Sequence, residues 1–339
     1  MRARHFAALA VVVILGCNGG GRARDVAGER DRERRPRGDQ RAVDAGAAEV
    51  PGVVGQPVVA GKQARVFTHA SAHALAIDAA NLYYGDAEND GIYSMAKTGG
   101  EPVRLARRAP VAGAIALDSG SITWIASPGD AVLKLALKNG GQPATLRDRG
   151  IFSDVTAVSG DVFITEVVGA GGALLRVTGP TAARLATFDG SPRAVVADST
   201  HAYVFTSTKV LRTPHAKGEV ETLATGSGFA HPQIDAGFLY FIAEVDKVRV
   251  VARLPKAGGP MTIIATDVRG PIDFEGGEIL FFDAARPQVR AVRASGGPVR
   301  VVVENEALAT ASSIVADPRT VYIATGTQES GAILAVDRR

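Results

Sequence analysis

The chain has 339 residues, of which 46% are hydrophobic but only 6% aromatic, and its formal net charge is +3. The hydrophobic share is enough for a packed fold whose core is built mainly from Ala, Val, Leu and Ile. Removal of an N-terminal signal peptide containing Arg2 and Arg4 would lower the net charge by two, to +1. A net charge this small does not indicate nucleic-acid binding. The single cysteine, Cys17, excludes a disulfide framework or a cysteine-based metal cluster in the folded part.

Residues 1–16 are predicted to be a signal peptide. Arg2 and Arg4 precede an apolar stretch, residues 6–15, that is too short to span a membrane. The stretch ends in Ile14-Leu15-Gly16-Cys17, which resembles the lipobox of bacterial lipoproteins. The resemblance implies that Cys17 is lipid-modified and becomes the first residue after cleavage. An ordinary secretion signal with an incidental cysteine is the alternative.

Residues 17–61 are predicted to form a disordered, charged tether. From Arg22 to Glu49 the chain carries eight Arg and seven Asp or Glu, so it cannot bury enough apolar surface to fold. The interleaved acids largely cancel the positive field of residues 30–37, which favours a tether over a lipid- or nucleic-acid-binding patch. Several acyl chains on Cys17 would hold it stably, since one chain binds a membrane only marginally. Asn18 follows the cysteine, and the resemblance to Gram-negative lipoproteins, in which Asp there favours the inner membrane, implies an outer-membrane location.

From Ala74 to Arg339 the chain repeats one pattern of short strands and turns seven times. The middle of the second strand carries, at intervals of 37 to 42 residues, Tyr83, Thr123, Phe163, Tyr203, Tyr240, Leu280 and Tyr322. Five residues earlier most copies carry an Asp, which favours turns because its side chain can hydrogen-bond to the nearby backbone. The residues at this position are Asp78, Asp118, Val158, Asp198, Asp235, Glu275 and Asp317. Units end in glycine-rich turns such as Gly99-Gly100.

About four strands in forty residues are typical of one propeller blade. The sequence therefore predicts an all-β, seven-bladed β-propeller over residues 62–339, whereas a β-sandwich has no reason to repeat its turns at a fixed interval. The seventh copy stops after its third strand, at 331–339. The segment from Gln63 to Thr68 resembles the fourth strands elsewhere, so we expect this N-terminal strand to complete the last blade and leave fewer free edges.

Motifs for catalysis or metal binding are weak. Asp86 to Gly91 resembles the front of a calcium loop, but Lys97 stands where a bidentate Glu is needed, so a solvated hairpin tip is the default. The histidines lack zinc-helix spacing, and His201 and His215 fall at turns, where we expect them to be exposed. No nucleophile elbow or phosphate loop is present, and no cofactor is expected.

The repeat register brings one set of polar residues together. The first strand of each blade should line the central channel, with its start at the rim. Most of these positions carry small residues. The exceptions are His73, Asp154, Arg193, His231 and, farther along the strand, Asp273. These side chains could together bind a polar ligand or carry out catalysis. Wet channel rims also carry polar residues without any function, and this alternative remains open.

The repeats resemble those of secreted bacterial propellers related to the NHL and TolB-type groups. The likeness is carried by units such as Ala-Ile-Asp-Ala-Ala-Asn-Leu-Tyr-Tyr, which begins at Ala76, followed by Ile-Tyr-Ser-Met-Ala-Lys-Thr-Gly-Gly-Glu-Pro from Ile92. It covers Gln63 to Arg339 and implies fold and cell-envelope location, but these groups host many functions.

Three functions stay open. The first is a non-enzymatic binding or scaffold lipoprotein, a monomer that binds a protein or a small polar ligand, contacts the membrane through Cys17 and does not bind nucleic acid. The second is a lyase or hydrolase similar to the seven-bladed streptogramin lyases. That resemblance implies that His231, with Asp273 or Asp154, supplies a general base and metal contacts. The ordered motif of that group is not evident in this sequence. The third is an envelope assembly factor bound through blade-edge loops.

Overall fold

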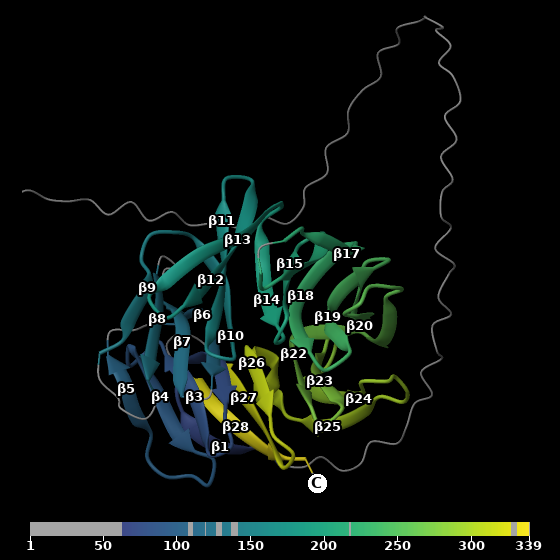
Figure 1. Ribbon diagram of the computed structural model, residues 1–339. Coiled ribbons are helices and arrows are strands. Elements are labelled where there is room, and N and C mark those ends of the chain that lie inside the picture. The colour runs from purple at the N-terminus through teal and green to yellow at the C-terminus, as the bar shows by residue number, and fades with distance from the viewer. Residues whose placement is uncertain are drawn as a thin grey trace, which may run out of the picture. The chain divides into compact units, whose positions relative to one another are not determined.

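Figure 1 shows the computed structural model, which describes residues 63–107, 111–118, 120–126, 131–136, 142–216, 218–326 and 331–338. Seven antiparallel sheets of four strands each surround a central axis. The prediction of an all-β, seven-bladed β-propeller is thereby confirmed. The predicted signal peptide, Cys17 and the predicted tether lie outside the described residues. No helix in the described ranges is long and apolar enough to cross a membrane.

The first three blades follow one another along the chain. Blade 1 contains β2 (Ala72–Ile77), β3 (Asn81–Asp86), β4 (Gly91–Ala96) and β5 (Val103–Arg107). Blade 2 contains β6 (Val111–Asp118), β7 (Ser121–Ala126), β8 (Ala131–Ala136) and β9 (Ala144–Arg147). Blade 3 contains β10 (Phe152–Val158), β11 (Asp161–Val168), β12 (Gly171–Thr178) and β13 (Thr181–Asp189).

The next three blades have the same order of strands. Blade 4 contains β14 (Pro192–Ala197), β15 (His201–Thr206), β16 (Lys209–Pro214) and β17 (Glu221–Thr225). Blade 5 contains β18 (Ser227–Ile234), β19 (Phe238–Val245), β20 (Val248–Pro255) and β21 (Thr262–Thr266). Blade 6 contains β22 (Val268–Glu275), β23 (Glu278–Asp283), β24 (Gln288–Arg293) and β25 (Arg300–Glu304).

Blade 7 joins the two ends of the described chain. It contains β26 (Ser313–Ala316), β27 (Thr320–Gly326) and β28 (Gly331–Asp337), and its fourth strand is the N-terminal β1 (Arg65–His69). β1 pairs antiparallel with β28, with Arg65 opposite Ala335 and His69 opposite Ala332. The predicted closing strand is confirmed, shifted toward the C-terminus from the expected segment 63–68.

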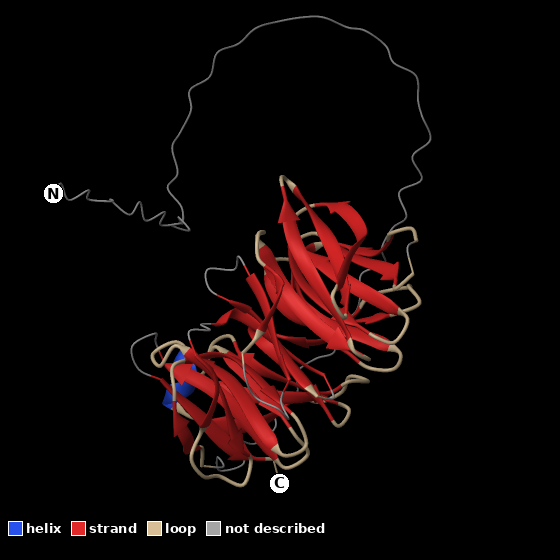
Figure 2. Cartoon of the chain, turned by 60° about the vertical axis from the view of Figure 1, so that its left-hand side comes forward, coloured by secondary structure: helices blue, strands red, loops and turns tan. Residues whose placement is uncertain are grey.

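The connection into blade 7 contains a short 3₁₀ helix, η1 (Glu306–Thr310), drawn in blue in Figure 2. Asn305 caps it by accepting a hydrogen bond from the backbone N–H of Ala307 at 2.9 Å. The repeat pattern did not predict this turn of helix.

The first strands of consecutive blades contact one another, and β26 contacts β2, so these strands form the inner wall of a closed ring. Figure 1 shows β10, β14, β18, β22 and β26 gathered around the axis. The hydrophobic core lies between neighbouring sheets: Trp124 of blade 2 is fully buried in a cluster with Tyr83 of blade 1, and Phe282 of blade 6 shares a cluster with Ile323 of blade 7. Each blade therefore depends on its neighbours for its core.

The recurring Asp organises the turn between the first and second strands. The Asp78 carboxylate accepts hydrogen bonds from the backbone N–H groups of Ala80 and Asn81, at 2.8 and 2.7 Å, and from the hydroxyl of Tyr83 at 2.7 Å. The pairs Asp198–Tyr203 and Asp235–Tyr240 repeat this arrangement. The turn residue and the residue five positions later thus form one unit.

Two copies without Asp use a different turn. Blade 3 has Ser159 and Gly160 at φ 53° and 88°, and blade 6 has Gly276 and Gly277 at φ 63° and 78°. Two successive residues with positive φ are typical of the tight hairpin turn that matches the twist of its strands. The backbone conformation therefore does here what the Asp side chain does in blades 1, 4 and 5.

Candidate functional site

The five rim candidates lie on the inner strands of five different blades. His73 is on β2, Asp154 on β10, Arg193 on β14, His231 on β18 and Asp273 on β22. Among these five residues, all of which the structure describes, no hydrogen bond or ion pair joins one to another. The structure places them on the channel wall, as the register implied, and does not bring any two into direct polar contact.

Asp154 and Asp273 each bridge to the next blade. Oδ2 of Asp154 accepts a hydrogen bond from the backbone N–H of Val195 on β14, at 2.8 Å. Oδ2 of Asp273 accepts one from the backbone N–H of Ala316 on β26, also at 2.8 Å. Both residues are half-buried, and burial of their carboxyls raises the pKa of each to about 7 despite these hydrogen bonds, which oppose the rise. Near neutral pH both carboxyls are therefore partly protonated.

Two further side chains make the same kind of bridge. The side-chain amide of Gln233 on β18 donates to the carbonyl of Ile272 on β22 at 3.1 Å. The hydroxyl of Ser312 donates to the carbonyl of Ala72 on β2 at 3.2 Å, which links blade 7 to blade 1. Polar side chains on the channel wall thus satisfy backbone groups of the neighbouring inner strand.

His231 has an unusual backbone conformation and a crowded ring. Its φ is 51°, in the left-handed region, and it lies within the register shift between Ala230 and Gln233 in the pairing of β18 with β19. A Cβ on Gly270 of β22 would lie 2.5 Å from Cδ2 of His231, so only glycine fits opposite the ring. Solvent still reaches part of His231, but burial, with the charge of Arg249, lowers its pKa to about 4. The imidazole is therefore neutral at pH 7.

Arg249 and Arg269 act on His231 or lie near it, and the sequence did not indicate either of them as a site residue. Arg249 on β20 is exposed and acts electrostatically on both His231 and Arg269 of β22. The Arg269 guanidinium donates to the carbonyls of Leu308 and Ala311, at 2.7 and 3.2 Å, at the end of η1. Arg249 stands opposite Glu244 across the hairpin of β19 and β20, and nothing in the sequence marked it as a site residue. Arg269 could not be found either, because η1 was not predicted.

His73 and Arg193 occupy the beginnings of their strands and differ in burial. Nε2 of His73 is buried and has no hydrogen-bond partner among the described residues. Arg193 is exposed and makes no polar contact with any residue in the described ranges. Arg193 and His231 are therefore the two rim candidates that present side chains to solvent.

The hairpin that resembled a calcium loop uses its first acid for its own backbone. Asp86 is buried, and Oδ1 accepts the backbone N–H groups of Glu88 and Asn89 at 3.1 and 3.3 Å, while Oδ2 accepts from the Asn89 amide at 2.7 Å. This is the expected hairpin tip. In the part of the chain that the structure describes, no group of three or more His, Cys, Asp or Glu has the geometry of a metal site.

His215 corrects one expectation. Its ring lies 4.5 Å, between centroids, from the ring of Phe163 in the preceding blade, and its Nε2 is buried without a partner among the described residues. Burial lowers the pKa of His215. The prediction that His215 is exposed was wrong, because the turn that carries it packs sideways onto blade 3.

Comparison with known proteins identifies the fold. No protein-family profile and no curated protein matches the chain. Among solved structures, the Myceliophteria thermophila Cps50 (Swd1) β-propeller domain matches with a TM-score of 0.61 and 11% identity over 81% of this chain and all of that one. Kuenenia stuttgartiensis hydrazine synthase matches with a TM-score of 0.60 and 11% identity, over 78% and 95%. The AfRom2 CNH domain matches with a TM-score of 0.57 and 10% identity, over 81% and 98%. At this identity the likeness shows the propeller fold alone.

Proposed function

We propose that this chain is a cell-envelope lipoprotein whose propeller is a non-enzymatic binding or scaffold module. One observation carries the proposal: the half-buried carboxyls of Asp154 and Asp273 each accept a backbone N–H of the next blade. Each carboxyl therefore links two neighbouring inner strands, which suits a rigid platform. The lipid anchor rests on the sequence of residues 1–17, and a partner would be a protein or a small polar ligand.

The exposed rim residues support a role for this face in binding. Arg193 and His231 lie on adjacent blades, and neither side chain makes a hydrogen bond or ion pair with the residues that the structure describes. A rigid disc with free polar groups on one face suits partner recognition, because little conformational entropy is lost on binding.

The test is capture of partners by the full-length chain. The tagged protein is used on the detergent-solubilised envelope of its own bacterium, beside the variant Arg193→Ala/His231→Ala and the control Asp148→Ala, which alters an exposed loop. We expect the rim variant to lose most of the captured partner while its thermal unfolding stays as in the wild type. Equal capture by all three proteins would contradict a binding role for the rim.

One observation favours an enzyme as the second candidate. The His231 side chain is solvent-exposed and makes no hydrogen bond or ion pair with a described residue, so its imidazole is free to contact a substrate. A lyase or hydrolase would then lose turnover, and not partner capture, in the same His231 variant.

A further inference from the structure

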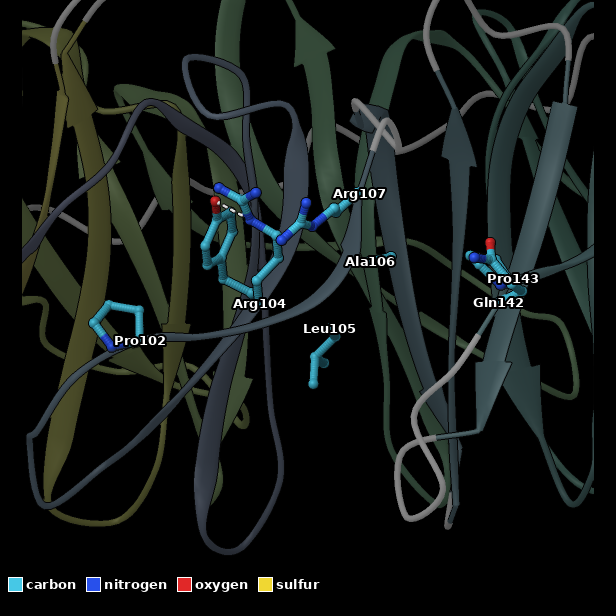
Figure 3. Close-up of a pocket in the computed structure, with 8 residues that line it drawn as sticks. Pro102, Arg104, Leu105, Ala106, Arg107, Gln142 and Pro143 are labelled. Carbon is cyan, nitrogen blue, oxygen red and sulfur yellow. Dashed lines mark hydrogen bonds between the residues drawn. The ribbon is translucent and has the colours of Figure 1, made fainter.

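A pocket of about 600 Å³ lies at the outer edge of the ring, away from the channel, between blades 1 and 2. β5 forms one wall with Arg104, Leu105, Ala106 and Arg107, and Gln142 and Pro143, just before β9, stand on the other side (Figure 3). Tyr93 and Pro102 complete the lining. We call this pocket the β5 groove.

The Arg104 side chain is held in position for a ligand. Arg104 stands directly opposite Tyr93 in the pairing of β4 with β5. Its Nε donates to the Tyr93 hydroxyl at 2.7 Å, and its guanidinium carbon lies 5.2 Å from the centre of the Tyr93 ring. The two terminal amino groups have no partner among the described residues, and this is the fork that binds a carboxylate.

The positive charge of the β5 groove is not compensated within the described fold. None of the eight residues that line it is acidic. Arg107 is exposed and makes no hydrogen bond or ion pair with any described residue. Five arginines on other third and fourth strands are neutralised in ion pairs, whereas Arg147, Arg249, Arg253 and Arg293 are not; the pairs are Arg176–Asp161, Arg184–Glu166, Arg212–Glu221, Arg290–Asp283 and Arg300–Glu278. The groove therefore complements an acidic occupant.

The strand that carries both arginines has a free edge. β5 is the last strand of its sheet, and its outer edge pairs with no strand that the structure describes. Val103, next to Arg104, is 59% exposed, while Leu105 packs partly into the cluster that contains Trp124. An extended peptide could add its backbone to this edge and place alternate side chains in the groove.

We propose that the β5 groove binds an extended acidic peptide segment of a partner protein. The peptide aligns with β5, places carboxylates on Arg104 and Arg107, and covers Val103 with an apolar side chain. The inference deepens the proposed binding function by naming a class of partner, and it uses a surface separate from the channel rim.

The experiment measures fluorescence anisotropy of a fluorescein-labelled octapeptide of alternating glutamate and valine with the full-length chain in detergent. We expect saturable binding that weakens at least about tenfold in Arg104→Gln/Arg107→Gln. Arg184→Gln/Arg300→Gln removes the same charge from exposed arginines on β13 and β25, and should bind as the wild type does. Arg107→Gln alone, which breaks no contact in the described fold, should weaken binding severalfold without any loss of thermal stability.

Several results would overturn the proposal. The first is equal weakening of octapeptide binding in the two double variants. The second is binding as tight as that of the octapeptide by a peptide with glutamine in place of glutamate. The third is displacement of the octapeptide by millimolar free glutamate, which needs no extended strand. The rim variant Arg193→Ala/His231→Ala should bind the octapeptide normally. Absence of octapeptide binding with intact, rim-dependent capture would reject the β5 groove and leave the proposed function standing.

Discussion

At the scale of single residues, Asp154 and Asp273 combine two properties that usually oppose each other. Each is half-buried, which penalises its charged form, and each accepts a backbone hydrogen bond that favours the charge. Burial dominates, so each carboxyl has a pKa of about 7. Both are titratable links between neighbouring inner strands, which makes ring stability depend on pH.

The sign of that dependence follows from proton binding. Above the ordinary pKa of an unfolded Asp, near 4, the unfolded chain releases a proton that the folded carboxyl keeps. The free energy of unfolding therefore falls as pH rises from about 4 to about 7, by at most about 1.4 kcal/mol per pH unit for each carboxyl. The lowered pKa of His231 has the opposite effect on the free energy of unfolding below about pH 6.5. This effect is the same in the wild type and in the Asp variants below, so it cancels when they are compared.

We predict that Asp154→Asn/Asp273→Asn gains more thermal stability relative to the wild type at pH 8 than at pH 5. Asn carries no proton to lose, and its side-chain oxygen can still accept the N–H of Val195 or Ala316. Melting temperatures at the two pH values test this, with the exposed Asp148→Asn as the control. A gain of the same size at both pH values would show that burial does not perturb these carboxyls as described.

At the scale of elements, β1 closes the ring. Phe67 of β1 is 8% exposed and meets the ring of Tyr322 on β27 edge-to-face, with centroids 5.2 Å apart. Its neighbour Val66 points outward and is 53% exposed. The strand is thus attached through one face, and removing it would leave the edge of β28 unpaired.

We predict that Phe67→Ala lowers the free energy of unfolding by about 3 kcal/mol, since it removes a buried aromatic ring and leaves a cavity. Val66→Ala, on the same strand but exposed, should change it by less than about 0.5 kcal/mol. Chemical denaturation of both variants measures the difference. Similar effects of the two substitutions would contradict the attachment of β1 through its Phe67 face.

At the scale of the whole molecule, ion pairs also link neighbouring blades. Besides the channel contacts, Lys97 of blade 1 pairs with Asp317 of blade 7 at 2.8 Å, and Lys256 of blade 5 pairs with Asp198 of blade 4 at 2.8 Å. The first of these pairs lies at the junction that β1 closes. A ring so linked is a stable platform that the proposed lipid anchor at Cys17 would hold at the membrane.

We predict that the wild-type chain fractionates with the outer membrane and that Cys17→Ala moves it to the soluble fraction. A lipid on the thiol is the proposed attachment, and no lipid can be added to alanine. Asn18→Asp should redirect the protein to the inner membrane, whereas Asn18→Ala should leave it in place. Membrane separation followed by immunoblotting measures this. Continued membrane association of Cys17→Ala would reject the anchor.

Much of the architecture was predictable because it depends on residues close together in the chain. The Asp–Tyr pairs at five-residue spacing form within one hairpin, as in Asp78 and Tyr83. The copy number and the missing fourth strand of the last copy sufficed to predict seven blades closed by β1. Local turn chemistry and a regular period therefore determined the fold from the sequence alone.

The tertiary structure alone decided what happens between blades. Asp154 meets Val195, and His215 packs on Phe163, across about forty to fifty residues of chain, and the β5 groove exists because Arg104 and Gln142 face each other from separate sheets. The repeat fixes where each residue sits within its blade, but these contacts depend on how neighbouring sheets twist and tilt around the axis. That lateral geometry arises when neighbouring blades pack together, since only then do their facing surfaces share a buried boundary.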